Sequence, residues 1–203
     1  MLKELSPFPP ASFFSLSTKI RKKVGRLSYL PSTAGLLYEK EFARLGVIWS
    51  EGGLTLHLSV KKKLEETVYP RYQDGDSLEV FIDTRDLKNA KSVHRFCHHF
   101  IFLPEEVDGI KAEEITRFKA DESHELASPE LFVIETKVGR RDYEMEIHIP
   151  KAALHGYDPL EFNRLGFTYR INRHGGDSQH FALSSRFFSL EKHPALWATL
   201  ILT

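Results

Sequence analysis

The segment that most constrains the fold is a run of alternating side chains that follows the turn signal Asp74-Gly75-Asp76. Side chains alternate across a β-strand, so 78–83 would place its three aliphatic residues on one face and Glu79, Phe81 and Asp83 on the other. Burying a carboxylate without polar partners is costly, whereas a bound ligand can supply those partners. The segment therefore predicts a strand with one core face and one candidate binding face.

The same alternation, with turn residues between the segments, continues through most of the chain. We expect strands over 42–49, 54–60, 78–83, 94–103, 131–138, 143–149, 165–172, 180–184 and 195–202, with a weaker strand over 114–118. Pro104 is expected to end the strand before it, and 151–154 offers at most one helical turn. About nine or ten strands with little helix predict an all-β fold, an antiparallel jelly-roll-like β-sandwich.

Residues 1–35 are expected to be a basic lead-in segment, and 36–203 the sandwich domain. The lead-in segment carries six lysines and arginines against one glutamate, and the run 19–23 is its centre. One interpretation is a patch for anionic lipid or nucleic acid. The interpretation that we favour is a solvated arm, or a charged guard beside an edge strand.

Composition excludes several classes of protein. Acidic and basic residues balance at 28 each, so no global field attracts nucleic acid, and no apolar stretch is long enough to span a bilayer. The single cysteine, Cys97, excludes an internal disulfide. No apolar stretch of a cleaved signal peptide follows Lys3, so we expect a cytoplasmic protein, with export by another route as the alternative.

The sequence contains no local catalytic or metal-binding motif of the common kinds. The pair Glu144 and Glu146 is interpreted as a solvated strand face rather than as a glycosidase acid and base. Ten histidines stand out, but His98 and His99 would point to opposite faces of one strand. Cys97 and His99 supply only two ligands, so we predict neither catalysis nor a metal site. Haem or metal binding through this strand stays an alternative that absorbance and elemental analysis would test.

Two further strands carry polar groups that suit a polyhydroxylated ligand. If the phenylalanines of 96–102 pack inward, Arg95 and His99 face the same way as Glu79. In 165–172, Arg170 and Asn172 share a polar face. Guanidinium, amide and carboxylate groups on neighbouring strands give directional hydrogen bonds. The alternative is a solvated outer face with charge pairs.

Several segments resemble, in order, the family 9 carbohydrate-binding modules over roughly 40–203. They are Trp49-Ser50-Glu51-Gly52-Gly53-Leu54, Asp76-Ser77-Leu78-Glu79-Val80-Phe81-Ile82-Asp83, Tyr143-Glu144-Met145-Glu146-Ile147-His148-Ile149-Pro150, Leu165-Gly166-Phe167-Thr168-Tyr169 and Pro194-Ala195-Leu196-Trp197-Ala198-Thr199-Leu200. Further segments are similar to an uncharacterised bacterial branch of that superfamily, which is related to the DOMON-like sandwiches: Asp83-Thr84-Arg85-Asp86, Arg95-Phe96-Cys97-His98-His99-Phe100 and His155-Gly156-Tyr157-Asp158-Pro159.

The resemblance implies a β-sandwich whose ligand face lies on one sheet, where a glutamate and polar neighbours bind a terminal sugar between two tryptophans. Glu79 matches that glutamate, Arg170 stands where an amide is expected, and Tyr72 lies near the first clamp position. No tryptophan stands in 189–193 for the second clamp, and Phe187 or Phe188 would replace it only if the loop shifts.

Structural calcium is common in the family, and this makes Asp83 and Asp86 candidates for a calcium site, although a turn at the end of a strand explains the pair equally well.

The leading hypothesis is non-catalytic binding of a carbohydrate or similar polar ligand. Hydrogen bonds would come from Glu79, Arg95, His99, Arg170 and Asn172, and stacking surfaces from Tyr72 and Phe188. Loss of Glu79 or Arg170 is then expected to abolish binding and to leave stability nearly unchanged. The alternative is a protein–protein interaction or scaffold domain with an aromatic patch around Phe187-Phe188.

Overall fold

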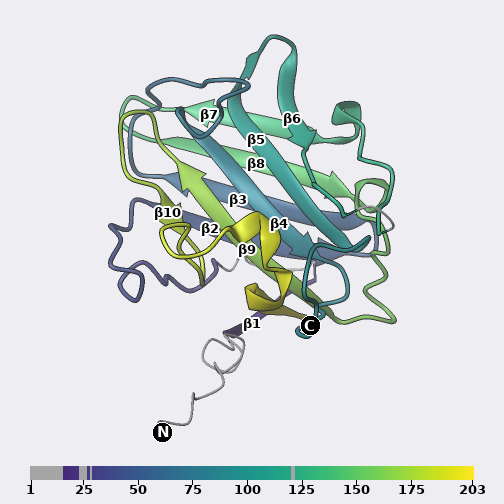
Figure 1. The fold of residues 1–203 in the computed structure, drawn as a ribbon. Helices are drawn as coiled ribbons and strands as arrows, with labels where there is room; N and C mark the ends of the chain where they lie inside the picture. Colours follow the sequence, from purple (N-terminus) through teal and green to yellow (C-terminus); the bar gives the residue numbers. More distant parts are fainter. Residues whose placement is uncertain (1–15, 23–26, 28, 120–121) are drawn as a thin grey trace, which may run out of the picture.

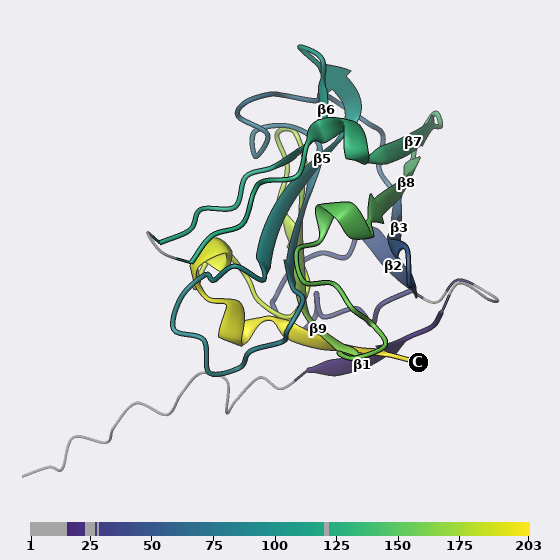
Figure 2. The ribbon, with the colours of Figure 1, turned by 90° about the vertical axis from the view of Figure 1, so that its right-hand side faces the viewer.

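Two β-sheets pack face to face in the computed structural model, which describes residues 16–22, 27, 29–119 and 122–203 (Figures 1 and 2). The larger sheet has the order β1 (Ser17–Ile20), β11 (Ala198–Leu202), β9 (Arg164–Asn172), β4 (Ser77–Asp83), β5 (Cys97–Val107) and β6 (Ile110–Glu114), and β10 (Gln179–His180) pairs with β9. The smaller sheet has the order β2 (Ala43–Ser50), β3 (Gly53–Val60), β8 (Tyr143–Pro150) and β7 (Val133–Val138). The predicted all-β sandwich is confirmed.

The core lies between the sheets and is built from the alternating apolar positions. Leu78, Val80 and Ile82 of β4 pack into it, together with the leucines of β3. Removing such a side chain from water contributes roughly 1.5–3 kcal/mol. The face assignment of 78–83 is therefore confirmed.

A second, smaller apolar cluster covers part of the outer face of the larger sheet. Phe81 of β4 packs there with Cys97 and with Trp197, Leu183 and Leu190 from the chain that follows β10. Figure 2 shows this segment, in yellow, lying against the outer side of the sheet. All seven residues of β4 are consequently buried, those of its polar face included.

Several strand boundaries differ from the sequence-based expectation. β5 begins at Cys97 rather than at 94 and runs past Pro104 to Val107, so the prediction that Pro104 ends the strand is wrong. The register shifts between Phe102 and Val107, and such an irregularity is where a strand tolerates proline. β6 covers 110–114 instead of 114–118. β10 has two residues instead of the strand expected over 180–184. The strand expected from 195 begins later, because 194–196 forms a 3-10 turn before β11.

The N-terminal part of the larger sheet was not anticipated. Ser17–Ile20 forms β1, which pairs with β11 in parallel, Ser17 opposite Thr199 and Ile20 opposite Leu202. Ile20 is buried in the core, so these residues of the expected lead-in segment are part of the sandwich. Lys22 forms an exposed ion pair with Glu51, 2.8 Å between Nζ and Oε1, and 1–15 lie outside the described residues. Among the described residues, no helix is long and apolar enough to cross a membrane.

Candidate functional site

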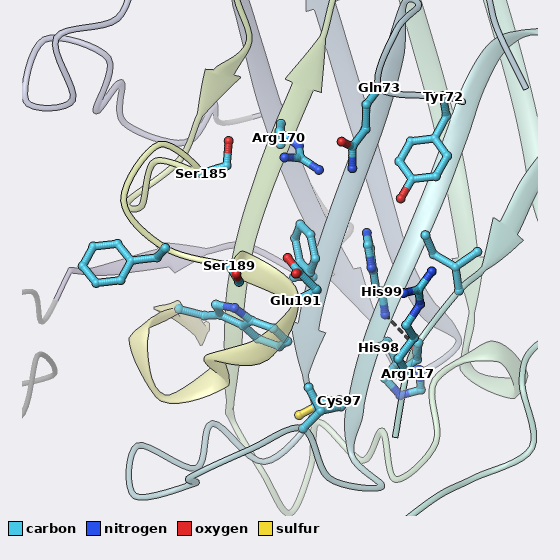
Figure 3. A pocket seen from close by; sticks show the side chains of 16 residues that line it. Tyr72, Gln73, Cys97, His98, His99, Arg117, Arg170, Ser185, Ser189 and Glu191 are labelled. Carbon is cyan, nitrogen blue, oxygen red and sulfur yellow. Dashed lines mark hydrogen bonds between the residues drawn. The ribbon is translucent and has the colours of Figure 1, made fainter. Parts of the chain in front are cut away.

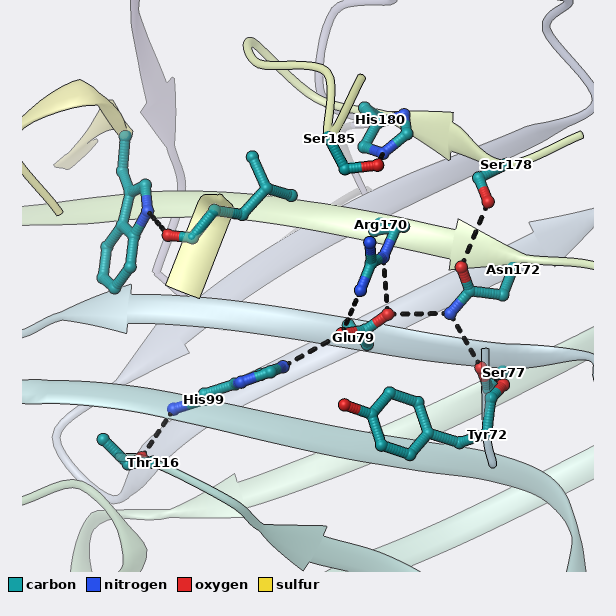
Figure 4. Close-up of polar contacts among 12 residues, drawn as sticks. Tyr72, Ser77, Glu79, His99, Thr116, Arg170, Asn172, Ser178, His180 and Ser185 are labelled. Atoms are coloured by element: carbon teal, nitrogen blue, oxygen red, sulfur yellow. Dashed lines mark hydrogen bonds and ion pairs between the residues drawn. The ribbon is translucent and has the colours of Figure 1, made fainter. Parts of the chain in front are cut away.

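The register of the larger sheet brings polar side chains from three strands together. Glu79 of β4 is directly opposite Arg170 of β9, and Phe81 is directly opposite His99 of β5. Residues opposite each other in an antiparallel pair point to the same face. Arg170 and His99 therefore flank Glu79 on the outer face of the sheet (Figure 4).

The carboxylate of Glu79 is fully bonded by its neighbours. Arg170 donates twice, from Nε to Oε1 at 2.6 Å and from Nη2 to Oε2 at 2.7 Å. His99 Nε2 lies 3.1 Å from Oε2, and Asn172 Nδ2 donates to Oε1 at 2.8 Å. These four bonds use the roughly four acceptor positions of a carboxylate, and Glu79 is 0% exposed. Glu79 therefore fixes Arg170 and His99 in place and has no lone pair left for a ligand.

The electrostatics of this group, which we call the Glu79 network, favour the charged state. Burial raises the pKa of Glu79, but the hydrogen bonds from His99 and Arg170 and their charges bring it down to about 2. Burial lowers the pKa of Arg170, and the bonds and charge of Glu79 outweigh that effect and raise it. The pair is thus a bidentate ion pair at neutral pH.

Further hydrogen bonds from neighbouring residues fix the side chain of Asn172 and the backbone of His99. Asn172 donates to Ser77 Oγ at 3.0 Å and accepts from Ser178 Oγ at 3.1 Å. The backbone N–H of His99 donates to Thr116 Oγ1 at 2.8 Å. The side chain of His99 also stacks on Phe81, with 4.1 Å between ring centroids. The groups that face outward are therefore preorganised.

A cavity of about 320 Å³, which we call the sheet cavity, opens above this network (Figure 3). Such a volume is at the small end of the usual range for small-molecule sites. Its walls combine polar groups with aromatic rings, from the loop before β4, from the sheet, from the chain after β6 and from the chain after β10. The lining residues include Tyr72, Gln73, Phe81, His99, Arg117, Arg170, Ser185, Phe188, Glu191 and Trp197.

The structure separates the seven predicted ligand-binding residues into three groups. Tyr72, His99, Arg170 and Phe188 line the sheet cavity. Glu79 and Asn172 are buried beneath it, at 0% and 1% exposure.

Arg95 does not belong to this site. It precedes β5 and its Nε lies 3.3 Å from Oε2 of exposed Glu122. The prediction extended the strand alternation back to 94, but β5 begins only at Cys97, so Arg95 does not share the face of His99.

Several cavity residues were missed because they lie outside strands. Gln73, Arg117 and Glu191 come from loops or a short 3-10 turn, where no periodicity signals a face. Trp197 falls in the predicted strand 195–202 but lies directly before β11. It is buried in the outer apolar cluster, its Nε1 donates to the Leu190 carbonyl at 2.9 Å, and it also lines the sheet cavity.

The carboxylates considered for calcium do not fit such a site. Asp83 accepts the backbone N–H groups of Arg85, at 2.9 Å, and Leu87, at 2.7 Å. Asp86 Oδ1 pairs with Lys88 Nζ at 2.6 Å, and its Oδ2 accepts from Thr199 Oγ1 at 2.8 Å. A lysine ammonium already neutralises Asp86, so these side chains stabilise a turn.

Solved structures with a similar fold include family 9 carbohydrate-binding modules. A family 9 carbohydrate-binding module from Caldicellulosiruptor kristjanssonii in complex with cellotriose is 14% identical, with a TM-score of 0.64 over 92% of this chain and 93% of that chain. The module from the same organism in complex with glucose is 12% identical, with a TM-score of 0.65 over 92% of this chain and 95% of that chain. No protein-family model matches the chain, and no curated protein matches it significantly. At these identities the comparisons establish the fold, which is that of the family 9 modules.

Proposed function

We propose that the chain binds a carbohydrate, or a similarly polyhydroxylated ligand, in the sheet cavity and does not catalyse a reaction on it. The observation that carries the proposal is Arg170, a cavity-lining guanidinium held by a buried carboxylate with two short hydrogen bonds. A donor fixed in this way loses little conformational freedom on binding. Two structures of the same fold, both of a family 9 module from Caldicellulosiruptor kristjanssonii, are complexes with cellotriose and with glucose, and this likeness supports the proposal.

The cavity offers the mixture of groups that a sugar requires. Two of the five N–H bonds of Arg170 go to Glu79, and the others, which have no hydrogen-bond partner among the described residues, are left for ligand hydroxyl oxygens. Glu191 supplies a carboxylate that accepts hydrogen bonds from hydroxyl groups, and Gln73 supplies both a donor and an acceptor. Tyr72 and Phe188 provide flat apolar surface for the C–H faces of a sugar ring.

Beside the cavity, hydrogen bonds connect Ser185, His180 and Glu39 as the serine, histidine and acidic residue of a hydrolase triad are connected. His180 Nδ1 donates to Glu39 Oε1 at 2.7 Å, so its Nε2 accepts from Ser185 Oγ at 2.8 Å. Acyl transfer also needs N–H donors for the developing oxyanion. The N–H groups of the three residues after Ser185 all donate to Ser184. This arrangement supports a positioning role for Ser185 rather than a nucleophilic one.

We therefore expect no hydrolysis of 4-nitrophenyl acetate above the rate of a Ser185→Ala variant. The serine has a base but its neighbouring donors are already bonded. Release of 4-nitrophenol, followed by absorbance with equal amounts of both proteins, is the measurement. Turnover by the parent chain that Ser185→Ala lacks would establish an esterase and overturn the non-catalytic part of the proposal.

Trp197 gives an optical test of binding. The chain has two tryptophans, and Trp49 lies on β2 of the other sheet with its Nε1 bonded to the Thr203 carbonyl. In a Trp49→Phe variant the remaining fluorescence comes from the sheet cavity. We expect a saturable change of that fluorescence during titration with glucose or cello-oligosaccharides.

The matched control is Trp197→Phe, which keeps only Trp49 and should stay unchanged through the same titrations. Equal responses from both variants would place the sugar away from the sheet cavity. A flat response of Trp49→Phe to every sugar would favour the alternative, a protein-interaction surface around Phe187, which is 74% exposed.

A further inference from the structure

A buried cluster of three side chains lies behind one wall of the sheet cavity. His98 comes from β5, Glu114 from the end of β6 and His124 from the loop that follows β6. Their side chains are 0%, 0% and 2% exposed. His98 points to the opposite face from His99 and stacks on Phe100, with 5.3 Å between ring centroids. We call these three residues the His–Glu–His cluster.

Three polar groups lie within hydrogen-bond distance of one oxygen of Glu114, which is more than its two lone pairs can accept from. His98 Nδ1 lies 2.9 Å from Oε1 and His124 Nε2 lies 3.0 Å from it. Thr116 Oγ1 donates to the same oxygen at 2.7 Å. A carboxylate oxygen carries two lone pairs. The other oxygen, Oε2, accepts the N–H of Ala127 at 2.8 Å, so the crowding is confined to the side of the two histidines.

The hydrogen bond of His124 Nδ1 limits what can lie between His124 Nε2 and the carboxylate of Glu114. His124 Nδ1 is 2.6 Å from the Arg95 carbonyl oxygen, which only accepts, so Nδ1 carries a hydrogen. In a neutral imidazole, Nε2 then bears a lone pair. That lone pair would face Glu114 Oε1 at 3.0 Å, and two acceptors at this distance repel each other unless a positive group lies between them. The candidates are an additional proton and a metal ion.

We propose that the His–Glu–His cluster binds Zn²⁺ or a similar divalent transition metal through His98 Nδ1, His124 Nε2 and the carboxylate of Glu114. Two imidazoles and one carboxylate are a three-residue zinc set that leaves one position for water. The donor atoms all lie within 4.8 Å of one another, compared with roughly 3.3 Å between ligands in a tetrahedral zinc shell. One ion replaces two ring protons and thereby relieves the crowding at Oε1.

The surroundings of His124 match those of a metal ligand. A ligating histidine generally donates its other ring N–H to a carbonyl or carboxylate, as His124 does to Arg95. Its ring also stacks on His155, with 5.2 Å between centroids and 9° between planes. The metal would tie the loop around His124 to β5 and β6. Thr116 connects the cluster to the sheet cavity, since it donates to Glu114 and accepts from the His99 N–H.

A second group of potential ligands, Asp83, His94 and Cys97, lacks the feature on which the proposal rests. His94 Nδ1 accepts the backbone N–H of Phe96 at 3.4 Å, so its Nε2 carries the proton. Nε2 lies 3.4 Å from Cys97 Sγ and 3.5 Å from Asp83 Oδ2, and both of these atoms can accept its hydrogen. Donor and acceptor already match there, and we propose no metal at this second group.

The test is metal binding by the full chain after removal of metals with a chelator and desalting. Titration with zinc chloride, followed by calorimetry, should show one equivalent bound per chain. Co²⁺ should bind at the same stoichiometry and give the visible absorption bands of a four-coordinate site. Zinc should also raise the thermal unfolding midpoint of the parent chain.

Variants decide whether the cluster is responsible. His124→Gln and Glu114→Gln should weaken zinc binding at least about 100-fold, since even a group behind a ligand changes affinity 10- to 100-fold. His94→Gln, which alters the second group and leaves the His–Glu–His cluster intact, should bind as the parent does. Circular dichroism checks that each variant is folded.

The proposal is overturned if the parent chain binds no zinc at micromolar concentrations, or if His124→Gln binds it with unchanged affinity. The first result would mean that an additional proton lies between His124 and Glu114. Because zinc is titrated without sugar, failure of this site and failure of the carbohydrate proposal are distinguished.

Discussion

Replacement of Glu79 by glutamine is expected to lower the free energy of unfolding by about 3–5 kcal/mol, the usual cost of removing one partner from a buried ion pair. The carboxylate is 0% exposed and accepts four hydrogen bonds. Glutamine keeps the size but loses the charge, and its NH₂ group would face donors of Arg170 or Asn172. Urea unfolding at pH 7 is the measurement.

Two controls make this expectation specific. Glu144→Gln on the exposed face of β8 should change the unfolding free energy by no more than about 0.5 kcal/mol. Adding Arg170→Met to Glu79→Gln should recover part of the loss, because no unpaired guanidinium remains. A Glu79→Gln variant as stable as the Glu144→Gln control would show that the network does not stabilise the fold.

The same carboxylate predicts a pH dependence. The pKa of Glu79 is about 2 in the folded chain against an ordinary value of 4.5, so folding favours the ionised form. The stabilisation is therefore fully present above about pH 4.5 and is lost as the pH falls toward 2. A gap of this size corresponds to roughly 3 kcal/mol, and the difference between the parent and Glu79→Gln should shrink across that window.

This expected loss of stability differs from the expectation drawn from the sequence, in which loss of Glu79 leaves stability nearly unchanged. That expectation assumed a carboxylate that faces the ligand. In the structure it faces Arg170, His99 and Asn172. In the proposed site Glu79 would act on a ligand only through Arg170, so its replacement would weaken binding and stability together. A separate probe of binding must come from a residue of the cavity wall.

Tyr72→Ala is expected to lower ligand affinity by about 10- to 100-fold, the effect of removing an aromatic residue that carries binding energy. The stability should change by less than about 1 kcal/mol. Tyr72 lines the sheet cavity from the loop before β4. Its carbonyl oxygen accepts from Ser77 Oγ at 2.6 Å, and alanine keeps that carbonyl.

The matched control is Tyr29→Ala, which removes a partly exposed tyrosine that does not line the sheet cavity. It should leave the affinity unchanged. Affinities from titration calorimetry and midpoints from urea unfolding separate the two effects. If Tyr72→Ala binds the ligand with the same affinity as the parent chain, Tyr72 does not belong to the proposed site.

The faces of β4 were predictable because every second residue of 78–83 is aliphatic, and a period of two has one structural meaning. The same rule correctly put Arg170 and His99 on the face of Glu79. What it could not give was the pairing between strands. That pairing decides that Arg170 lies opposite Glu79 and occupies its carboxylate, and it depends on contacts far apart in sequence.

Other parts of the site were unpredictable for local reasons. Arg95 continues an alternating pattern, yet a turn precedes β5 and changes the direction of its side chain. Gln73, Arg117 and Glu191 lie in loops or a short 3-10 turn, where no regular alternation of side chains indicates which way a residue faces. Likewise, His124 reaches Glu114 from a polar loop, and nothing in the spacing of these two residues signals a contact.

β1 shows a related limit. Ser17–Ile20 is short, and its neighbouring lysines suggested a solvated arm. Its stability comes from pairing with β11, almost the whole chain length away, and from one buried side chain, Ile20. Propensity over so few residues cannot compete with a tertiary contact of this kind.

The most direct test of the central claim is calorimetric titration of the intact chain with glucose, cello-oligosaccharides and a panel of other mono- and disaccharides. We predict saturable heat with one sugar per chain for at least one member of the panel. The heat should be lost in Arg170→Lys, which keeps the charge but not the two-pronged contact with Glu79. No heat for any sugar, or equal heat from a folded Arg170→Lys variant, would contradict carbohydrate binding in the sheet cavity.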